Sequence, residues 1–111
     1  MTPLERANTY MEIIFSGKNM ERLREILTDD FTFSGPLYQF GSAAEYIDAM
    51  GEDPLAGAGY TITSAFENEN AACLIYNFTK PGVSTPMAQT FTMRDGKICR
   101  VELLFDPRPF E

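Results

Sequence analysis

The sequence predicts an α+β fold in which three N-terminal helices pack on a curved antiparallel sheet. In the first half of the chain, apolar residues recur at helical spacing. In most of the second half, they alternate with polar residues over four longer runs. Short connections rich in Gly, Pro, Asn and Asp join these runs, and such connections force neighbouring strands to be antiparallel. Helices at one end of the sequence and strands at the other favour helices on one face of the sheet.

The first helix has a clear start and a clear end. Thr2-Pro3-Leu4-Glu5 is a capping box with proline at the first helical position. Ser16-Gly17 should end the helix. The apolar stripe between them lies beside Tyr10 and consists of Leu4, Ala7, Met11 and Ile14.

Two further helices and two short strands are expected before the long strands begin. A short helix should run from Asn19 to Leu27, with its charged residues turned outward. A second capping box, Ser42 to Glu45, should open a helix that reaches Met50 and is followed by a loop over Gly51–Gly59. Between these helices we expect a strand over Phe31–Phe33, a turn at Gly35-Pro36 and a return strand over Leu37–Phe40.

Asp95-Gly96 lies between two alternating runs and is the strongest local signal, because this dipeptide favours a tight hairpin. The four strands are expected near Tyr60–Glu67, Ala71–Thr79, Met87–Arg94 and Ile98–Phe105. Alternation turns Tyr76 and Gln89 toward the interior. In the last strand it turns one set inward and the other outward: Cys99, Val101, Leu103 and Phe105 against Ile98, Arg100, Glu102 and Leu104.

Length and charge restrict the class of protein. The 111 residues predict one domain spanning 1–111. The net charge is −7 and there is no basic run, which argues against nucleic acid or an anionic membrane surface as a partner. The first residues lack the layout of a signal peptide, and no apolar run approaches the length that spans a membrane. We therefore expect a cytoplasmic protein.

The chain contains no histidine and only two cysteines, Cys73 and Cys99. This composition excludes Ser-His and Cys-His nucleophile pairs and most zinc sites. We expect no cofactor and no metal, and any catalysis must use carboxylates, tyrosine or bound water. The two cysteines are expected to be free thiols.

Two segments carry a resemblance to a known family: Thr28-Asp29-Asp30-Phe31-Thr32-Phe33, and Asp95-Gly96-Lys97-Ile98 with the later Phe105-Asp106-Pro107. With the order of elements, they make the chain resemble the SnoaL-like polyketide cyclase family. That family belongs to the nuclear-transport-factor-two-like superfamily, which includes the ketosteroid isomerases. The resemblance implies a cone-shaped α+β barrel, often dimeric, with a pocket between the first helix and the concave sheet. It implies less about chemistry, because such folds include isomerases, cyclases, hydrolases and non-enzymes.

The resemblance carries over to individual residues only in part. Tyr10 falls where the ketosteroid isomerases keep the tyrosine that donates a hydrogen bond to the forming oxyanion. Their catalytic carboxylate falls at Gly35, and their second oxyanion donor falls near Gln89. The cyclase branch uses an aspartate of the late strands as acid or base, and Asp106 is the nearest carboxylate in that region.

Asp106 and Tyr10 are the candidate catalytic residues. An apolar environment would raise the pKa of Asp106 and suit it to proton transfer. The alternative is that an Asp before a Pro begins a turn that ends the strand. Tyr10 is either a hydrogen-bond donor in the pocket or a core tyrosine. The candidate substrate-binding residues are Tyr38, Tyr60, Tyr76, Gln89, Phe91, Leu103 and Phe105.

Three functions remain open at this point. The first is an acid/base enzyme of isomerase or cyclase type acting on a hydrophobic carbonyl compound. The second is a non-catalytic protein that binds a hydrophobic small molecule in the same pocket. The third is a dimeric interaction module. We also expect a homodimer through the convex sheet face, where the weakly charged outer residues are Ile75, Ile98, Leu104, Thr90 and Thr92.

Overall fold

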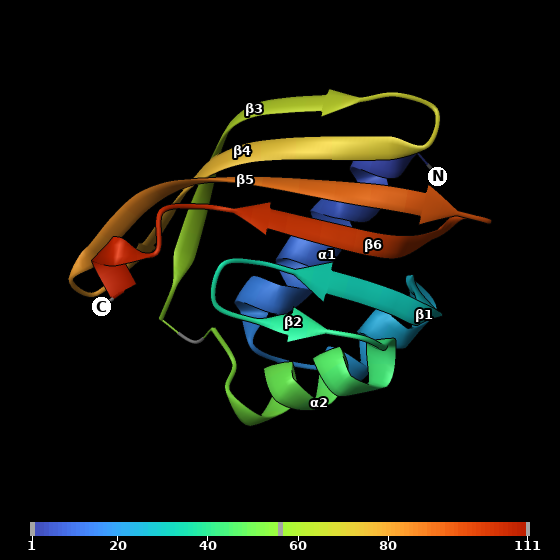
Figure 1. The fold of residues 1–111 in the computed structure, drawn as a ribbon, viewed down its shortest axis with the longest axis horizontal. Helices are drawn as coiled ribbons and strands as arrows, with labels where there is room; N and C mark the ends of the chain where they lie inside the picture. The colour runs from blue at the N-terminus through green and yellow to red at the C-terminus, as the bar shows by residue number, and fades with distance from the viewer. Residues whose placement is uncertain (1, 56, 111) are drawn as a thin grey trace.

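The computed structural model describes residues 2–55 and 57–110 and confirms a mixed α+β fold (Figure 1). A curved six-stranded sheet has the order β2-β1-β6-β5-β4-β3. Helix α1 crosses one face of this sheet, and α2 lies beside β2 (Figure 1). In chain order, the elements are α1 (Pro3–Ser16), η1 (Met20–Glu25), β1 (Leu27–Ser34), β2 (Gln39–Phe40), α2 (Ala43–Glu52), β3 (Gly59–Glu67), β4 (Ala71–Lys80), β5 (Val83–Arg94), β6 (Lys97–Leu104) and η2 (Arg108–Phe110).

The predicted limits of α1 are confirmed. The Thr2 hydroxyl accepts a hydrogen bond from the Glu5 backbone N–H at 3.1 Å, and the Glu5 carboxylate accepts one from the Thr2 backbone N–H at 3.2 Å. These two bonds satisfy backbone donors that have no partner inside the helix. The helix ends at Gly17, whose φ of 68° lies in the left-handed region that glycine adopts without strain.

The prediction of three N-terminal helices is not confirmed in detail. The second of them is the 3₁₀ helix η1, which ends at Glu25 instead of reaching Leu27. Leu27 instead begins β1 and pairs with Ile98 of β6, so pairing in the sheet overrides the helical pattern. The third helix, α2, begins after Ser42 as expected and ends at Glu52. The loop predicted over Gly51–Gly59 therefore begins two residues later, and its Ala56 lies outside the described residues.

The sheet is mixed, so the prediction of a purely antiparallel sheet is wrong. The four C-terminal strands β3 to β6 do form the expected antiparallel meander. Strand β1, however, pairs parallel with β6. The sequence signals for antiparallel pairing are short turns between consecutive strands. No such signal exists for two strands separated by most of the chain.

The assignment of Ile98 to the outer face of the sheet is also wrong. Met93 pairs with Ile98 and Thr92 pairs with Arg100, so Cys99 is an extra residue in β6 and forms a bulge. A bulge shifts the alternation by one residue, and Ile98 consequently lies on the inner face, fully buried. The inward assignments of Tyr76 and Gln89 are confirmed by their burial.

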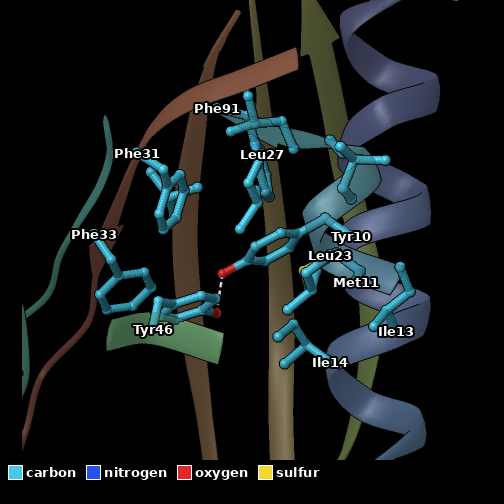
Figure 2. Packing of buried hydrophobic residues seen from close by; sticks show 14 of the residues in the cluster. Tyr10, Met11, Ile13, Ile14, Leu23, Leu27, Phe31, Phe33, Tyr46 and Phe91 are labelled. Atoms are coloured by element: carbon cyan, nitrogen blue, oxygen red, sulfur yellow. Dashed lines mark hydrogen bonds between the residues drawn. The ribbon is translucent and has the colours of Figure 1, made fainter. Parts of the chain in front are cut away.

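The core lies between the concave face of the sheet and the helices (Figure 2). Its largest fully buried side chains include Tyr10, Tyr46, Phe31 and Phe91. Cys73 and Cys99 are free thiols, as expected. Among the described helices, none has the length and apolar composition needed to cross a membrane.

Candidate functional site

A cavity of about 570 Å³ lies between α1, α2 and the concave face of the sheet. Its walls are mainly aromatic and aliphatic side chains. They come from both α-helices, from β1, β2, β4, β5 and β6, from adjoining loops, and from η2. The exposed side chains of Leu37, Tyr38 and Lys80 mark the mouth of this cavity. A largely apolar concavity of this size is typical of a small-molecule site.

Four hydrogen-bonding side chains from four different elements meet in the interior: Tyr10 of α1, Tyr46 of α2, Tyr76 of β4 and Gln89 of β5. The hydroxyl groups of Tyr10 and Tyr46 are hydrogen-bonded to each other, as Figure 2 shows. The Tyr76 hydroxyl donates to the Gln89 Oε1 atom at 2.7 Å. All four residues are at most 3 % exposed, so each hydrogen bond forms away from bulk water.

Burial keeps the three tyrosines protonated. It raises the pKa of Tyr10 well above its ordinary value, and the neighbouring Tyr46 hydroxyl raises it further. Burial likewise raises the pKa of Tyr46 and of Tyr76. Near neutral pH, all three are therefore uncharged hydroxyl groups that can donate a hydrogen bond.

Aromatic packing holds the two central tyrosines in place. The Tyr10 ring meets the Phe91 ring edge to face, with centroids 5.2 Å apart. The Tyr46 ring stacks on Phe33 at 5.1 Å and contacts Phe31 at 5.2 Å (Figure 2). Neighbours on several sides restrict the rotamers of both side chains, so their hydroxyl groups are positioned before any ligand arrives.

No carboxylate lies in the interior among the described residues. Gly35 lines the cavity at the position where the resemblance would put a catalytic carboxylate, and a Cβ there would lie 3.3 Å from the Phe33 ring. The charged lining residues are Glu52, Asp53 and Lys80, and all three are exposed. The described interior thus offers uncharged hydrogen-bonding groups without a charged acid or base.

Asp106 lies outside the lining of the cavity, and the prediction of a raised pKa is wrong. Its carboxylate accepts hydrogen bonds from the Arg108 Nε atom at 2.9 Å and from the Arg108 backbone N–H at 3.0 Å. The Arg108 guanidinium and this backbone bond lower the pKa of Asp106 to about 2. The geometry is that of the alternative interpretation, in which Asp106 begins a turn after the last strand.

The other predicted site residues divide into two groups. Six of them line the cavity: Tyr10, Tyr38, Tyr76, Gln89, Leu103 and Phe105. Phe91 and Tyr60 do not belong to the lining. Phe91 is fully buried in the core, and Tyr60 packs on Phe15 with ring centroids 4.5 Å apart.

Tyr46 is the interior residue that the sequence analysis missed. The buried residues of α2 are Ala43, Tyr46 and Ile47, which follow the spacing of one helix face. The helix expected from the capping box at Ser42 to Met50 was given no inward-facing residue at Tyr46. A stripe counted from Ala43 would have included it.

Comparisons with known proteins agree with this architecture. A model of the SnoaL-like domain matches residues 7–101. An NTF2-like protein of unknown function from Cytophaga hutchinsonii has a TM-score of 0.85 and 25 % identity, over 100 % of this chain and 96 % of that one. A search of curated proteins finds no match.

Two further solved structures share the fold at lower identity. An LEH-like epoxide hydrolase of M. tuberculosis has a TM-score of 0.79 and 11 % identity, over 96 % of this chain and 84 % of that one. A candidate SnoaL-like polyketide cyclase of Jannaschia sp. CCS1 has a TM-score of 0.76 and 14 % identity, over 99 % of this chain and 92 % of that one. These proteins differ in their described chemistry, so the shared fold alone does not name a reaction.

Proposed function

Because the chain belongs to the SnoaL-like domain family, we propose that it binds a hydrophobic small molecule whose carbonyl oxygen accepts a hydrogen bond from the tyrosine pair in the cavity. One observation carries this proposal. The hydroxyl groups of Tyr10 and Tyr46 lie together in a cavity lined mainly by aromatic and aliphatic side chains, whose described interior holds no charged side chain. Apolar walls favour a hydrophobic body, and a few placed polar groups fix its orientation.

The hydrogen-bond inventory favours an acceptor group on the ligand. When two hydroxyl groups bond to each other, one hydrogen lies between the two oxygens and the other stays free to donate. The Tyr10–Tyr46 pair thus has one hydrogen to offer. The Gln89 Oε1 atom, an acceptor, already receives the hydrogen of Tyr76. The amide N–H groups of Gln89 are donors as well. A carbonyl oxygen can accept the free tyrosine hydrogen, whereas a group that can only donate cannot.

Binding is favoured over acid/base catalysis because the candidate base is missing. Gly35 has no side chain to supply one, and the Asp106 carboxylate is held by Arg108 outside the cavity. A second candidate function is an acid/base enzyme of isomerase or cyclase type. The exposed carboxylates Glu52 and Asp53 at the mouth favour it, and so does the occurrence of hydrolase and cyclase descriptions among proteins of this fold.

Prodan, a solvatochromic aromatic ketone, provides a direct test of binding. We expect saturable binding of one molecule per chain with a blue shift of its emission. The double variant Tyr10→Phe/Tyr46→Phe keeps the cavity apolar and removes both donors. It should weaken prodan binding about fivefold to tenfold, which corresponds to a net hydrogen bond of about 1 kcal/mol.

Two controls separate the hydrogen bond from general hydrophobic binding. The parent dimethylaminonaphthalene lacks the ketone and should bind the native chain and the double variant equally. Tyr38→Phe removes a hydroxyl at the exposed mouth and should leave prodan affinity unchanged. Equal loss of affinity for both probes would show that the ketone makes no specific contact.

We also propose that the chain pairs with a second copy through the convex sheet face. Register places Ile75, Ala88 and Leu104 in one row across β4, β5 and β6. Phe66, which the sequence analysis did not include, lies opposite Cys73 in the neighbouring row. Arg100 and Glu102 on this face form an ion pair within the chain. Neither residue therefore brings an unpaired charge into a symmetric interface between two copies. Ile98 is buried and is not part of this face.

A further inference from the structure

One part of the cavity wall belongs to neither the sheet nor the long helices, because the short 3₁₀ helix η2 that follows β6 supplies it. Phe110 of η2 lines the cavity together with Phe78 and Phe105. Its ring centroid lies 5.8 Å from that of Phe78 and 5.2 Å from that of Phe105. Lys80, which marks the mouth, lies with its Nζ atom 5.0 Å from the same ring. Phe110 therefore forms part of the wall next to the opening.

The segment that carries Phe110 is attached loosely to the sheet. In the described chain, each hydrogen bond found for Asp106–Phe110 joins two residues of that segment. They are the bonds from Arg108 to the Asp106 carboxylate and the bond from the Phe110 N–H to the Pro107 carbonyl at 3.0 Å. Packing of η2 against β5 and the ring contacts of Phe110 with Phe78, Phe105 and Lys80 hold the segment against the cavity. Such an attachment opens at lower free energy than a paired strand.

Two features set the position of the ring when it is closed. Pro107 and Pro109 flank Arg108 and restrict the backbone of the segment. The Asp106 carboxylate accepts from both the backbone and the guanidinium of Arg108, which fixes the turn that leads into η2. Asp106 and Arg108 are thus positioning residues that act through Phe110.

We propose that Phe110 is a lid residue that determines ligand specificity. Its ring closes the cavity over short hydrophobic ligands and excludes long ones. This inference rests on the proposed function, because it concerns the same cavity. The other walls belong to the sheet, the helices and the loops that join them, and the mouth also carries Leu37 and Tyr38. The ring of Phe110 occupies the place where an alkyl chain would leave the cavity.

Prodan and its analogue laurdan test this directly, since they share one aromatic ketone but carry a propionyl and a dodecanoyl chain. In the native chain we expect prodan to bind more tightly than laurdan. Phe110→Ala should improve laurdan binding relative to prodan about tenfold, as if about two further methylene groups were buried. Arg108→Ala leaves the wall intact but releases the turn, and it should shift the ratio in the same direction by a smaller factor.

Phe66→Ala is the matched control, because it removes an exposed phenylalanine of the outer sheet face and leaves the cavity wall intact. The ratio of laurdan to prodan affinity in this variant should equal that of the native chain, whether or not two copies pair. Native-like circular dichroism of every variant shows that the ratio reports the cavity and not unfolding. An unchanged ratio of laurdan to prodan affinity in Phe110→Ala overturns the lid role of Phe110, and the proposed binding of prodan still stands. Failure of the native chain and of Phe110→Ala to bind either ketone overturns the proposed function and this inference together.

Discussion

The hydroxyl group of Tyr10 on α1 is hydrogen-bonded to that of Tyr46 on α2, so the two helices present one polar site to the cavity. These residues lie 36 positions apart in the chain, and neither hydroxyl reaches solvent. The pair therefore has two consequences, one for the stability of the fold and one for its response to pH.

Tyr46→Phe should destabilise the protein by about 1–2 kcal/mol, because it removes one partner of a buried hydrogen bond. Urea unfolding measures this change. Tyr38→Phe, with a tyrosine that is 61 % exposed, should change stability by less than about 0.5 kcal/mol. An equal effect of the two substitutions would mean that the buried pair contributes nothing.

The buried tyrosines also predict a loss of stability at alkaline pH. Burial raises the pKa of Tyr10, Tyr46 and Tyr76 above the ordinary value of about 10. A group whose pKa is raised on folding stabilises the native state below its unfolded pKa. This contribution is lost as pH rises from about 10 toward the pKa of the folded state.

Urea midpoints measured across the alkaline range should therefore fall above pH of about 10. Tyr76→Phe should make the fall shallower, since one fewer phenol ionises only after unfolding. Ultraviolet titration provides an independent reading, because the buried tyrosines should ionise only when the chain unfolds. Ionisation of all five tyrosines in the folded chain near the ordinary pKa would contradict this explanation.

Asp106 should titrate far below an ordinary aspartate. The guanidinium and backbone N–H of Arg108 lower its pKa to about 2. The stabilisation from this pair is present above the ordinary pKa of an aspartate and is lost as pH falls toward 2. It is small, because the carboxylate is exposed. Carboxyl chemical shifts measured by NMR give the midpoint, and Arg108→Ala should return it to the ordinary range. A midpoint above that range would restore Asp106 as a candidate acid.

Local signals account for the parts of the fold that the sequence predicted. The capping box at Thr2 and the turn at Asp95-Gly96 depend on neighbours in the chain, and both are present, with positive φ at Asp95 and Gly96. The parallel pairing of Leu27 with Ile98 and the bulge at Cys99 depend on residues far apart. Alternation alone cannot reveal either of them, since a single extra residue reverses every face beyond it.

The site was predictable to a similar extent. Tyr10, Tyr76 and Gln89 follow from helical spacing and strand alternation, and all three line the cavity. Asp106 could not be assigned from the sequence, because its environment depends on where the turn after β6 places Arg108. Asp106 lies two residues beyond the end of β6, and the turn brings the Arg108 guanidinium to its carboxylate in place of the expected apolar neighbours.

The convex face gives a prediction about association in solution. Leu104 is 62 % exposed and lies in one row with Ile75, which is 37 % exposed. Exposed apolar residues gathered on one face are typical of an interaction surface. We expect light scattering to give twice the mass of one chain.

Leu104→Asp should convert this dimer to a monomer, because an isologous interface brings the substituted residue of each copy to the same patch and buries both charges. Leu37→Asp is the matched control. Leu37 is also an exposed leucine, at 47 %, but it lies at the cavity mouth and should leave the mass unchanged. Prodan affinity separates the two surfaces a second time, since Leu104→Asp should preserve it and Leu37→Asp should lower it. A native chain that stays monomeric at every concentration would exclude pairing through this face.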